Sequence, residues 1–482
     1  MAADGDRRPA GTAAADPCPD PAADRPDADA DRPLVAHRHR PGVLLAATAG
    51  LFLLAVVAAG YGLRAWGAAA GTGGGWTDWA WAPVALALLV QTVLYLAERP
   101  VRADAGQQRE LDRLEVAVLV PLYNEDPGYL RTSLASLLAQ TRPPQSVHVV
   151  DDGSTTDYAS LRAWWLTAAE RAGVRTTWQR RANRGKRAAQ LAAAAHCPGA
   201  DVLVTVDSDA RLDPRALHEL LQPLADPRVQ AVAGVVLAHN NRHGLISRIT
   251  DLWYVTNQLV DRSALSPLGA VMVCSGSLAA YRAAALTDHR EAYLTETFAG
   301  RPVTFSDDSL LTFYALRRGR VVQQPTALVF SAMPERVGHH LRQYLRWMRG
   351  STIRSLWRVR YLPLTHPALL AQVLRWYQHL AATATAVLLL TRTWRTGAPL
   401  PPVLLAVPLL IVAGQTLRYL TLRRSDQPLR SQLATWALTP LAVAWSWTVL
   451  RPVRWYATLT CLRTGWGTRQ HGPEVALAPA AG

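Results

Sequence analysis

Cysteine is scarce in this chain of 482 residues, which contains only four. Cys18, Cys197, Cys274 and Cys461 stand in unrelated contexts and show no paired spacing. Structural zinc sites and the disulfide frameworks of small secreted domains both depend on such pairs. The sequence therefore indicates neither a zinc site nor a disulfide scaffold.

Lysine is scarcer still, because only one of the 51 Lys and Arg residues is a lysine, Lys186 in "NRGKRAA". A lysine ammonium is a compact point charge on a flexible stem, which suits it to a phosphate group. The alternative interpretation is an ordinary surface charge that is lysine by chance. Both interpretations remain open at this point.

Long apolar runs divide the chain unevenly, which argues against one soluble domain. Gly42–Leu63 contains no charged residue, and a second apolar run, Trp79–Leu96, follows it closely. Each run is long enough to cross a hydrocarbon core of about 30 Å, so two transmembrane helices are predicted within residues 41–98. About forty polar residues precede them and argue against a cleavable signal peptide. This leading tail, 1–40, is rich in Pro, Ala and Asp and is predicted to be disordered.

The following 220 or so residues contain no such run and begin as an α/β unit. "VAVLVPLYNE" and "SVHVVDDGS" are short apolar runs that end in polar loops, with the helical pattern "YLRTSLASLLAQT" between them. This order predicts a βαβ unit in a parallel sheet, whose ligands lie beyond the carboxyl ends of the strands. The polar residues at these ends are Asn124, Glu125, Asp151, Asp152, Asp207 and Asp209.

Two of these acids stand two residues apart in "VTVDSDAR". In an extended strand, residues i and i+2 face the same way, so Asp207 and Asp209 would point into one small volume. Like charges repel there unless a cation or a sharp turn relieves them. A metal site and a solvated turn are the two interpretations.

A series of motifs then resembles one known family. "VPLYNE", "VDDGS", "NRGKR", "DSDA", "CSGSLAAYR", "SDDSLLT", "QYLRW" and "GWGTR" stand in the order typical of processive, membrane-bound family 2 glycosyltransferases, most similar to hyaluronan synthases and rhizobial chitooligosaccharide synthases. The resemblance spans residues 116–469. It implies a cytosolic α/β GT-A domain, at about 110–332, inserted between transmembrane α-helices, with a UDP-sugar as donor and a glycan as acceptor.

The resemblance also implies roles for the donor side. Asp207 and Asp209 look like ligands of Mg²⁺ or Mn²⁺, which prefer hard oxygen donors and would relieve the charge on the departing diphosphate. Lys186 would reach the diphosphate as well. The residues expected to bind the nucleotide are Tyr123, Glu125, Asp152, Lys186 and Asp207. Strand-end turns and surface charges are the alternatives for these residues.

On the acceptor side, the resemblance places the catalytic base at Asp308 in "TFSDDSLLT", although Ser306 replaces the Gly or Thr of the family. The same letters also fit a helix N-cap with acids in its first turn. Gln343, Arg346 and Trp347 match the family's Gln-x-x-Arg-Trp within an amphipathic region, 333–365. Trp347 would stack on a sugar and Arg346 would balance the diphosphate, whereas most neighbouring arginines are expected on an anionic membrane surface.

Three further apolar runs, Leu369–Leu390, Pro401–Leu417 and Ser431–Leu450, predict C-terminal membrane helices within 366–452. If the third run crossed fully, "GWGTR" would lie outside, away from the nucleotide. Because Pro440 interrupts this run and Pro452 follows it, we expect it to be re-entrant or interfacial. Residues 453–482 would then form a cytosolic gating loop in which Trp466 and Arg469 cover the nucleotide. The alternative is an anchor at the lipid interface.

These expectations describe a multi-pass plasma-membrane enzyme that builds a β-linked glycan containing N-acetylglucosamine, either alone or together with glucuronic acid. Transfer of one sugar to a lipid carrier and a catalytically inert membrane scaffold are the alternatives. Product length separates the first two, and UDP release separates both from the third. The expected partners are the UDP-sugar, the glycan acceptor and the lipid bilayer, with no nucleic acid.

Overall fold

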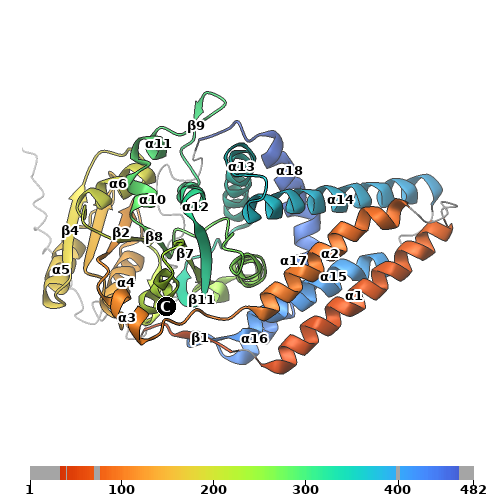
Figure 1. Ribbon diagram of the computed structural model, residues 1–482, viewed down its shortest axis with the longest axis horizontal. Helices are drawn as coiled ribbons and strands as arrows, with labels where there is room; N and C mark the ends of the chain where they lie inside the picture. The colour runs from red at the N-terminus through yellow and green to blue at the C-terminus, as the bar shows by residue number, and fades with distance from the viewer. Residues whose placement is uncertain (1–32, 40, 70–75, 398–401, 466–482) are drawn as a thin grey trace, which may run out of the picture. The chain divides into compact units, whose positions relative to one another are not determined.

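The computed structural model describes residues 33–39, 41–69, 76–397 and 402–465 (Figure 1). Their main feature is an eight-stranded mixed sheet in the order β4-β3-β2-β5-β8-β7-β11-β6, accompanied by two small two-stranded sheets, β1-β12 and β9-β10. The strands are β1 (Ala36–Arg38), β2 (Val116–Leu122), β3 (Ser146–Asp151), β4 (Arg175–Arg180), β5 (Val202–Thr205), β6 (Arg211–Leu212), β7 (Val229–Ala238), β8 (Ala279–Arg282), β9 (Thr297–Phe298), β10 (Arg301–Pro302), β11 (Arg320–Ser331) and β12 (Leu422–Arg424).

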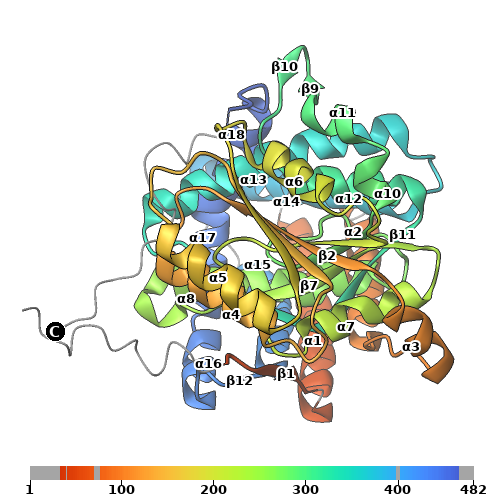
Figure 2. The ribbon, with the colours of Figure 1, turned by 90° about the vertical axis from the view of Figure 1, so that its left-hand side faces the viewer.

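Strand β2 shows why the sheet needs helices on both sides. All seven of its residues are buried, and alternate side chains enter two different cores. Val118 and Val120 pack in the core shared with α4 (Pro127–Leu138), α5 (Ala159–Arg171) and α7 (Ala216–Leu221). Leu119 packs in the core shared with α6 (Lys186–Ala195) and α12 (Asp307–Arg318). Figure 2 shows α4 and α5 on one face of the sheet and α6 on the other.

The helices have the following bounds: α1 (Gly42–Ala69), α2 (Trp76–Ala97), α3 (Ala105–Asp112), α4 (Pro127–Leu138), α5 (Ala159–Arg171), α6 (Lys186–Ala195), α7 (Ala216–Leu221), α8 (Leu245–Asn257), α9 (Ser263–Leu265), α10 (Ala284–Thr287), α11 (Arg290–Leu294), α12 (Asp307–Arg318), α13 (Val337–Tyr361), α14 (Pro367–Thr396), α15 (Pro402–Thr416), α16 (Leu429–Trp436), α17 (Thr439–Trp445) and α18 (Arg451–Leu459). A π-helical turn, Gln258–Arg262, joins α8 to α9, and a second, Ser446–Leu450, joins α17 to α18.

The predicted βαβ unit is confirmed, because β2 and β3 pair in parallel and α4 lies between them in the chain. Asp126 caps α4 by accepting hydrogen bonds from the backbone N–H groups of Gly128 and Tyr129. β5 also pairs in parallel with β2, so the carboxyl ends of β2, β3 and β5 lie at one edge of the sheet. β8 runs antiparallel between β5 and β7.

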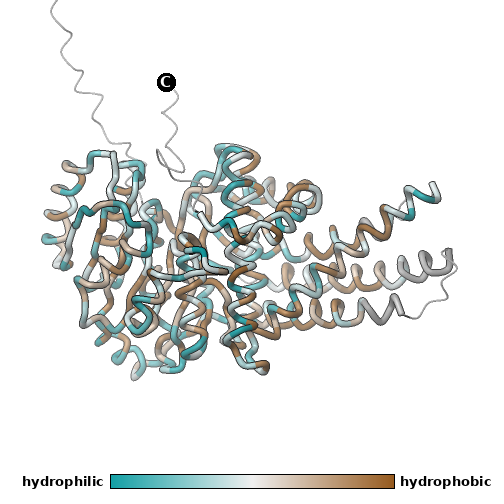
Figure 3. The backbone as a smooth tube through the Cα atoms, turned by 90° about the horizontal axis from the view of Figure 1, so that it is seen from above, coloured by the Kyte–Doolittle hydropathy of each residue, from teal (hydrophilic) through white to brown (hydrophobic). Residues whose placement is uncertain are grey.

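Among the apolar helices, α1 contacts α2 and α15, and α2 contacts α14 (Figure 1). Figure 3 shows long hydrophobic stretches along these helices. Within the described residues, one helical stretch, Gly42–Gly62, is long and apolar enough to cross a membrane. The pair Leu429–Trp436 and Thr439–Leu459, bent by 41°, would make a second span if it counts as one.

The expectation of a disordered tail over 1–40 is wrong at its end. Ala36–Arg38 forms β1, which pairs antiparallel with β12. The backbone N–H of Ala36 donates to Asp213, and Arg38 forms an ion pair with Glu98 at 2.5 Å. Residues 1–32 lie outside the described part of the chain.

Candidate functional site

Most of the predicted site residues line one cavity of about 2320 Å³. Its wall includes the side of the sheet where β2, β3 and β5 end, and it continues between α1, α2, α14 and α15. The predicted residues in this wall are Tyr123, Asp152, Lys186, Asp207, Asp209, Asp308, Gln343, Arg346 and Trp347. Trp466 and Arg469 lie outside the described residues.

Asp207 and Asp209 both reach this cavity, but they do so from a turn. Strand β5 ends at Thr205, so the expectation that the two acids share the face of an extended strand is wrong. Asp207 accepts hydrogen bonds from Lys186 Nζ at 2.7 Å and from Ser277 Oγ at 3.1 Å. Asp209 Oδ2 accepts from Ser331 Oγ at 2.8 Å and from the backbone N–H of Ala332 at 3.2 Å. The turn thus places both carboxylates in the wall of the cavity, and each carboxylate is held by different hydrogen-bond donors.

The lone lysine lies between acids from two elements. Lys186 begins α6, and its Nζ lies 2.7 Å from Asp207 Oδ1 and 3.2 Å from Asp307 Oδ2. Burial works to lower the pKa of Lys186, but Asp207 and Asp307 outweigh it and hold that pKa above its usual value. The ammonium therefore stays charged, and it is an internal ion-pair partner instead of a free surface charge.

The loop before Lys186 is fixed by Asp152. The Asp152 carboxylate accepts hydrogen bonds from the backbone N–H groups of Arg184, at 3.1 Å, and Gly185, at 2.7 Å. Burial raises the pKa of Asp152, and these two hydrogen bonds oppose that rise. Gly153 allows the close approach, since it has φ +82° and an added Cβ would lie 2.8 Å from the Asn183 nitrogen. Asp152 therefore positions Lys186 as well as lining the cavity.

Two neighbouring acids at the start of α12 differ in their surroundings. Asp307 is held by Lys186 and accepts from Gln190 Nε2 at 3.3 Å. Although burial works to raise the pKa of Asp307, Lys186 and Arg187 lower it. Burial and the charge of Asp307 raise the pKa of Asp308 to about 6. The pair therefore contains one held carboxylate and one that exchanges its proton near neutral pH.

The helix start predicted from "SDDSLLT" is confirmed in its position. Helix α12 begins at Asp307 with Ser306 at its N-cap, but the Ser306 side chain makes no capping hydrogen bond. Ser306 has φ +58°, the left-handed region that favours glycine. A glycine would adopt this conformation without steric cost.

Glu125 does not line the cavity, so its expected place in a uridine pocket is not what the structure shows. Its carboxylate is buried and accepts from Ser208 Oγ at 2.9 Å and from the backbone N–H of Asp126 at 3.1 Å. Ser208 stands between Asp207 and Asp209. Glu125 therefore supports the turn that carries both aspartates.

The Gln-x-x-Arg-Trp residues reach the same cavity from α13. Gln343 Oε1 is buried without a hydrogen-bond partner within the described residues, so it is an acceptor that a bound hydroxyl would satisfy. The ring of Trp347 stacks on Tyr254, with centroids 5.7 Å apart and planes 17° apart. Tyr254 and Arg262 also contact Ser275 Oγ, each at 2.8 Å.

Tyr254 and Arg262 are cavity-wall residues that sequence reasoning missed. They lie in "DLWYVTNQLVDR", where aromatic and apolar residues at helical spacing resemble any buried helix face. The available signal is a Tyr and an Arg eight residues apart on one helical segment.

Two arginines of α13 are exceptions to the expected surface position, because Arg354 and Arg358 lie inside the protein, whereas Arg342 and Arg360 are exposed. Arg354 pairs with buried Glu296, with Nη2 2.6 Å from Oε2. Glu296 also binds Arg187 at 2.7 Å, and Arg187 donates to the carbonyl of Phe305 at 2.7 Å. This network joins α13, α6 and the segment that leads into Asp308.

The two aspartates of the turn fit a divalent cation. Each presents carboxylate oxygens, the hard donors that Mg²⁺ and Mn²⁺ prefer, and each is oriented by hydrogen bonds from other elements. The cavity beside them has room for a nucleotide sugar. Within the described ranges, no group of three or more His, Cys, Asp or Glu residues is arranged for a metal, so the protein ligands at this turn would be the two aspartates alone.

Comparisons with known proteins agree with this arrangement. A sequence profile described as "Glycosyltransferase like family 2" matches residues 113–350. A hyaluronan synthase of Streptococcus pyogenes is 33% identical over 362 residues, which cover 74% of this chain and 83% of that protein. An N-acetylglucosaminyltransferase of Rhizobium meliloti is 36% identical over 268 residues, 53% of this chain and 59% of that protein.

Among solved structures, a mannosyltransferase from Pyrobaculum calidifontis in complex with GDP-Man and Mn²⁺ has a TM-score of 0.54 and 22% identity. The match covers 87% of this chain and 99% of that chain, and it identifies the sheet domain as a GT-A fold. The hyaluronan synthase similarity extends over most of both chains. The chain belongs to the family 2 glycosyltransferases and is similar to hyaluronan and chitooligosaccharide synthases.

Proposed function

We propose that this enzyme is a membrane-embedded, inverting glycosyltransferase that transfers sugar from a UDP-sugar to a growing β-linked polysaccharide. The sugar is N-acetylglucosamine, either alone in a chitin-like product or together with glucuronic acid in a hyaluronan-like product. One observation carries the proposal: Asp308, Lys186, the two turn aspartates and Trp347 line the same cavity, which continues between the apolar helices.

In this proposal the donor lies at the turn aspartates. Tyr123 and Asp152 face the nucleotide, while Asp207 and Asp209 hold Mg²⁺ or Mn²⁺. The cation would supply electrostatic stabilisation of the departing diphosphate. Lys186 adds a fixed positive charge to the same region. Arg346 adds another, because it reaches the cavity from α13.

Asp308 acts as the general base. Its carboxylate takes the proton of the acceptor hydroxyl as that oxygen bonds to the anomeric carbon, and the bond from that carbon to UDP breaks, which inverts the configuration. A pKa of about 6 lets Asp308 be ionised at neutral pH and still accept a proton. Asp307 is less suited to this role, because Lys186 and Gln190 already hold it.

The acceptor lies against Trp347, whose indole offers a stacking surface for a sugar ring. Tyr254 covers one face of that indole and fixes its orientation. Since the cavity continues between α1, α2, α14 and α15, the chain has a route for a polymer longer than one sugar. This continuity favours polymer synthesis over single-sugar transfer to a lipid carrier.

The membrane part of the proposal has the apolar helices as support. The most apolar 18 residues within Gly42–Gly62 have a mean hydropathy of 2.4, and only 11% of this stretch is buried inside the protein, as expected for a lipid-facing helix. The proposal therefore includes a multi-pass plasma-membrane protein with its GT-A domain in the cytosol, supported by the position of α14 beside α2 and of α15 beside α1.

The test is a transfer assay on the detergent-purified protein with Mg²⁺ or Mn²⁺ and a panel of UDP-sugars, singly and in pairs. UDP release and a product ladder that lengthens with time are expected with UDP-N-acetylglucosamine, alone or with a second donor. A product that never exceeds one added sugar would overturn the polymerase proposal. Absence of UDP release with every donor would overturn the activity itself.

A further inference from the structure

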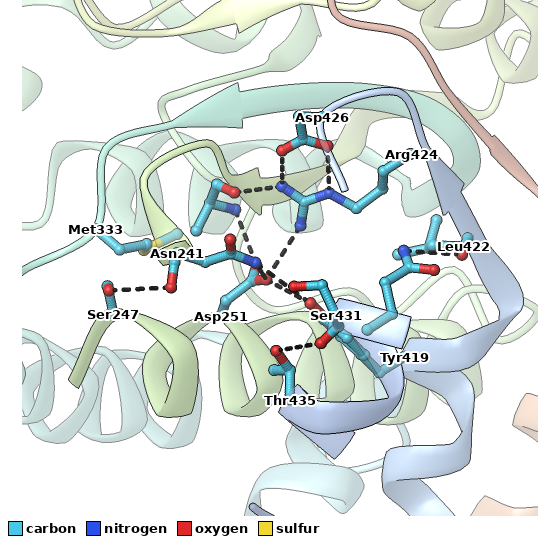
Figure 4. Close-up of polar contacts among 12 residues, drawn as sticks. Asn241, Ser247, Asp251, Met333, Tyr419, Leu422, Arg424, Asp426, Ser431 and Thr435 are labelled. Carbon is cyan, nitrogen blue, oxygen red and sulfur yellow. Dashed lines mark hydrogen bonds and ion pairs between the residues drawn. The ribbon is translucent and has the colours of Figure 1, made fainter. Parts of the chain in front are cut away.

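The connector between α15 and α16, residues 417–428, is bound to the sheet domain by a buried ion pair (Figure 4). Arg424 Nη1 lies 3.0 Å from Asp251 Oδ2, and both side chains are fully buried. Arg424 also donates to both oxygens of Asp426, at 2.9 and 2.6 Å. Removing charges from water is costly, so such a pair persists only when most of its polar atoms are satisfied.

The ion pair holds the end of strand β7. Arg424 Nη2 donates to the carbonyl of Ala238, and Asp251 Oδ1 accepts from the backbone N–H of Ala238 at 2.9 Å. Asp251 Oδ2 further accepts from Asn241 Nδ2 and from Tyr419 Oη, each at 2.8 Å (Figure 4). The segment from Ala238 to Asn241 is therefore held on both sides by one charged cluster.

The same segment is hydrogen-bonded to the residues that hold Asp209. Ala238 is paired in register with Ser331, and the backbone N–H of His239 donates to the Ser331 carbonyl at 3.2 Å. Asn240 exchanges two hydrogen bonds with the backbone of Met333, each at 2.8 Å. Ser331 Oγ then donates to Asp209 Oδ2 at 2.8 Å.

We propose that Arg424 and Asp251 are positioning residues for the metal-binding carboxylate of Asp209, acting through the backbone of residues 238–241 and 331–333. The proposal rests on the metal role of Asp209 given above. Groups that orient a ligand typically change metal affinity by about 10–100-fold when they are removed. The proposal also means that the connector, residues 417–428, and the metal site keep a fixed position relative to each other.

The experiment measures Mn²⁺ binding to the full-length, detergent-purified protein in the presence of UDP, by electron paramagnetic resonance of free Mn²⁺. Arg424→Gln is expected to weaken Mn²⁺ binding about tenfold, the lower end of that range because Arg424 acts through an intervening backbone segment. Ser331→Ala, which removes a direct partner of Asp209, is expected to weaken it at least as much.

Arg418→Gln is the matched control. Arg418 lies on the same connector, is equally buried and pairs with Glu98 at 2.7 Å, but it donates to the carbonyl of Leu259, which lies outside residues 238–241. The Mn²⁺ affinity of the Arg418→Gln variant is expected to stay within about twofold of that of the wild type. Equal Mn²⁺ affinities of Arg424→Gln and Arg418→Gln would overturn the positioning proposal.

Two further variants make the result unambiguous. If Arg424→Gln does not fold, judged by thermal unfolding, Asn240→Ala tests the same path without breaking the ion pair and is likewise expected to weaken Mn²⁺ binding severalfold. Asp209→Asn tests the metal role directly. If Asp209→Asn binds Mn²⁺ as the wild type does, the metal assignment fails, an outcome distinct from failure of the positioning step alone.

Discussion

Asp307→Asn should move the acidic limb of the pH–rate profile to lower pH. Asp308 has a pKa of about 6, raised by burial first and by the negative charge of Asp307 second. The Asn side chain keeps the size of Asp307 but removes that charge, so the pKa of Asp308 falls towards its ordinary value of 3.8. Lys186 acts in the same direction, because it stays close and positive after the change.

The size of the effect follows from the fraction of ionised base. With a pKa of about 6, roughly one tenth of Asp308 is ionised at pH 5, and a fall of one unit would raise that fraction to about one half. The base form is present above the pKa, so the variant should retain activity at pH 5 that the wild type loses. Its plateau rate should be lower, since a weaker base takes the proton less readily.

The assay is the initial rate of UDP release at saturating donor and metal, from pH 4.5 to 8, with each profile scaled to its own plateau. Glu291→Gln is a control, because Glu291 is an exposed acid of α11 outside the cavity wall. Asp308→Asn should remain nearly inactive at every pH. An unchanged midpoint in Asp307→Asn, or a normal rate in Asp308→Asn, would refute the assignment of the base.

Three further predictions concern the same cavity. Asp207→Asn should lower the transfer rate at least about a hundredfold, the scale of losing one electrostatic stabiliser, and near-normal turnover with a chelator present would contradict the metal role. Lys186→Arg should raise the donor KM although it keeps the charge, because a planar guanidinium cannot reproduce the two ion pairs of one ammonium, and Lys186→Ala should raise it further. Gly350→Ala should reduce activity and thermal stability, because the new Cβ would lie 1.8 Å from Ser306 Oγ. Adding Ser306→Gly should restore part of both, and a double variant no better than Gly350→Ala would show that the clash is not the cause.

The parts of the fold that could be predicted are those with a strong local signal. Strands β2 and β3 are continuous apolar runs that end in Asp, Asn and Gly, and α4 between them has helical spacing and an Asp at its N-cap. Strand β1 has three residues and exists only because β12, nearly 400 residues away in the chain, pairs with it. Nothing within "AHR" indicates that partner, so the sequence predicted disorder there.

The site shows the same division. Asp207, Asp209, Lys186 and Asp308 could be named because the order of motifs is informative and the chemistry requires these residue types. Arg354 could not, because its letters on α13 match those of a solvent-facing arginine, and its burial depends on Glu296, 58 residues away in the chain. A buried charge is predicted only together with its partner, and pairs this distant leave no periodic pattern.

The C-terminal end of the described chain bears on how the last apolar run is placed. Thr304, four residues before Asp308, donates from its backbone N–H and its hydroxyl to the carbonyl of Thr464, at 3.4 and 3.1 Å. Arg349 of α13 donates to Thr460 Oγ1 at 3.2 Å, so α18 ends beside the helix that carries the Gln-x-x-Arg-Trp residues.

Residue 464 therefore lies on the same side as the proposed base, whatever path the preceding helices take. If α1 with α2 and α14 with α15 each cross a membrane and return, the bent pair Leu429–Trp436 and Thr439–Leu459 cannot cross once more and still bring Thr464 to Thr304. A re-entrant path satisfies both conditions, because it begins and ends on the catalytic side. The contact between Thr304 and Thr464 thus supports the re-entrant interpretation more directly than the proline at position 440, which marks a break in a helix and not its direction.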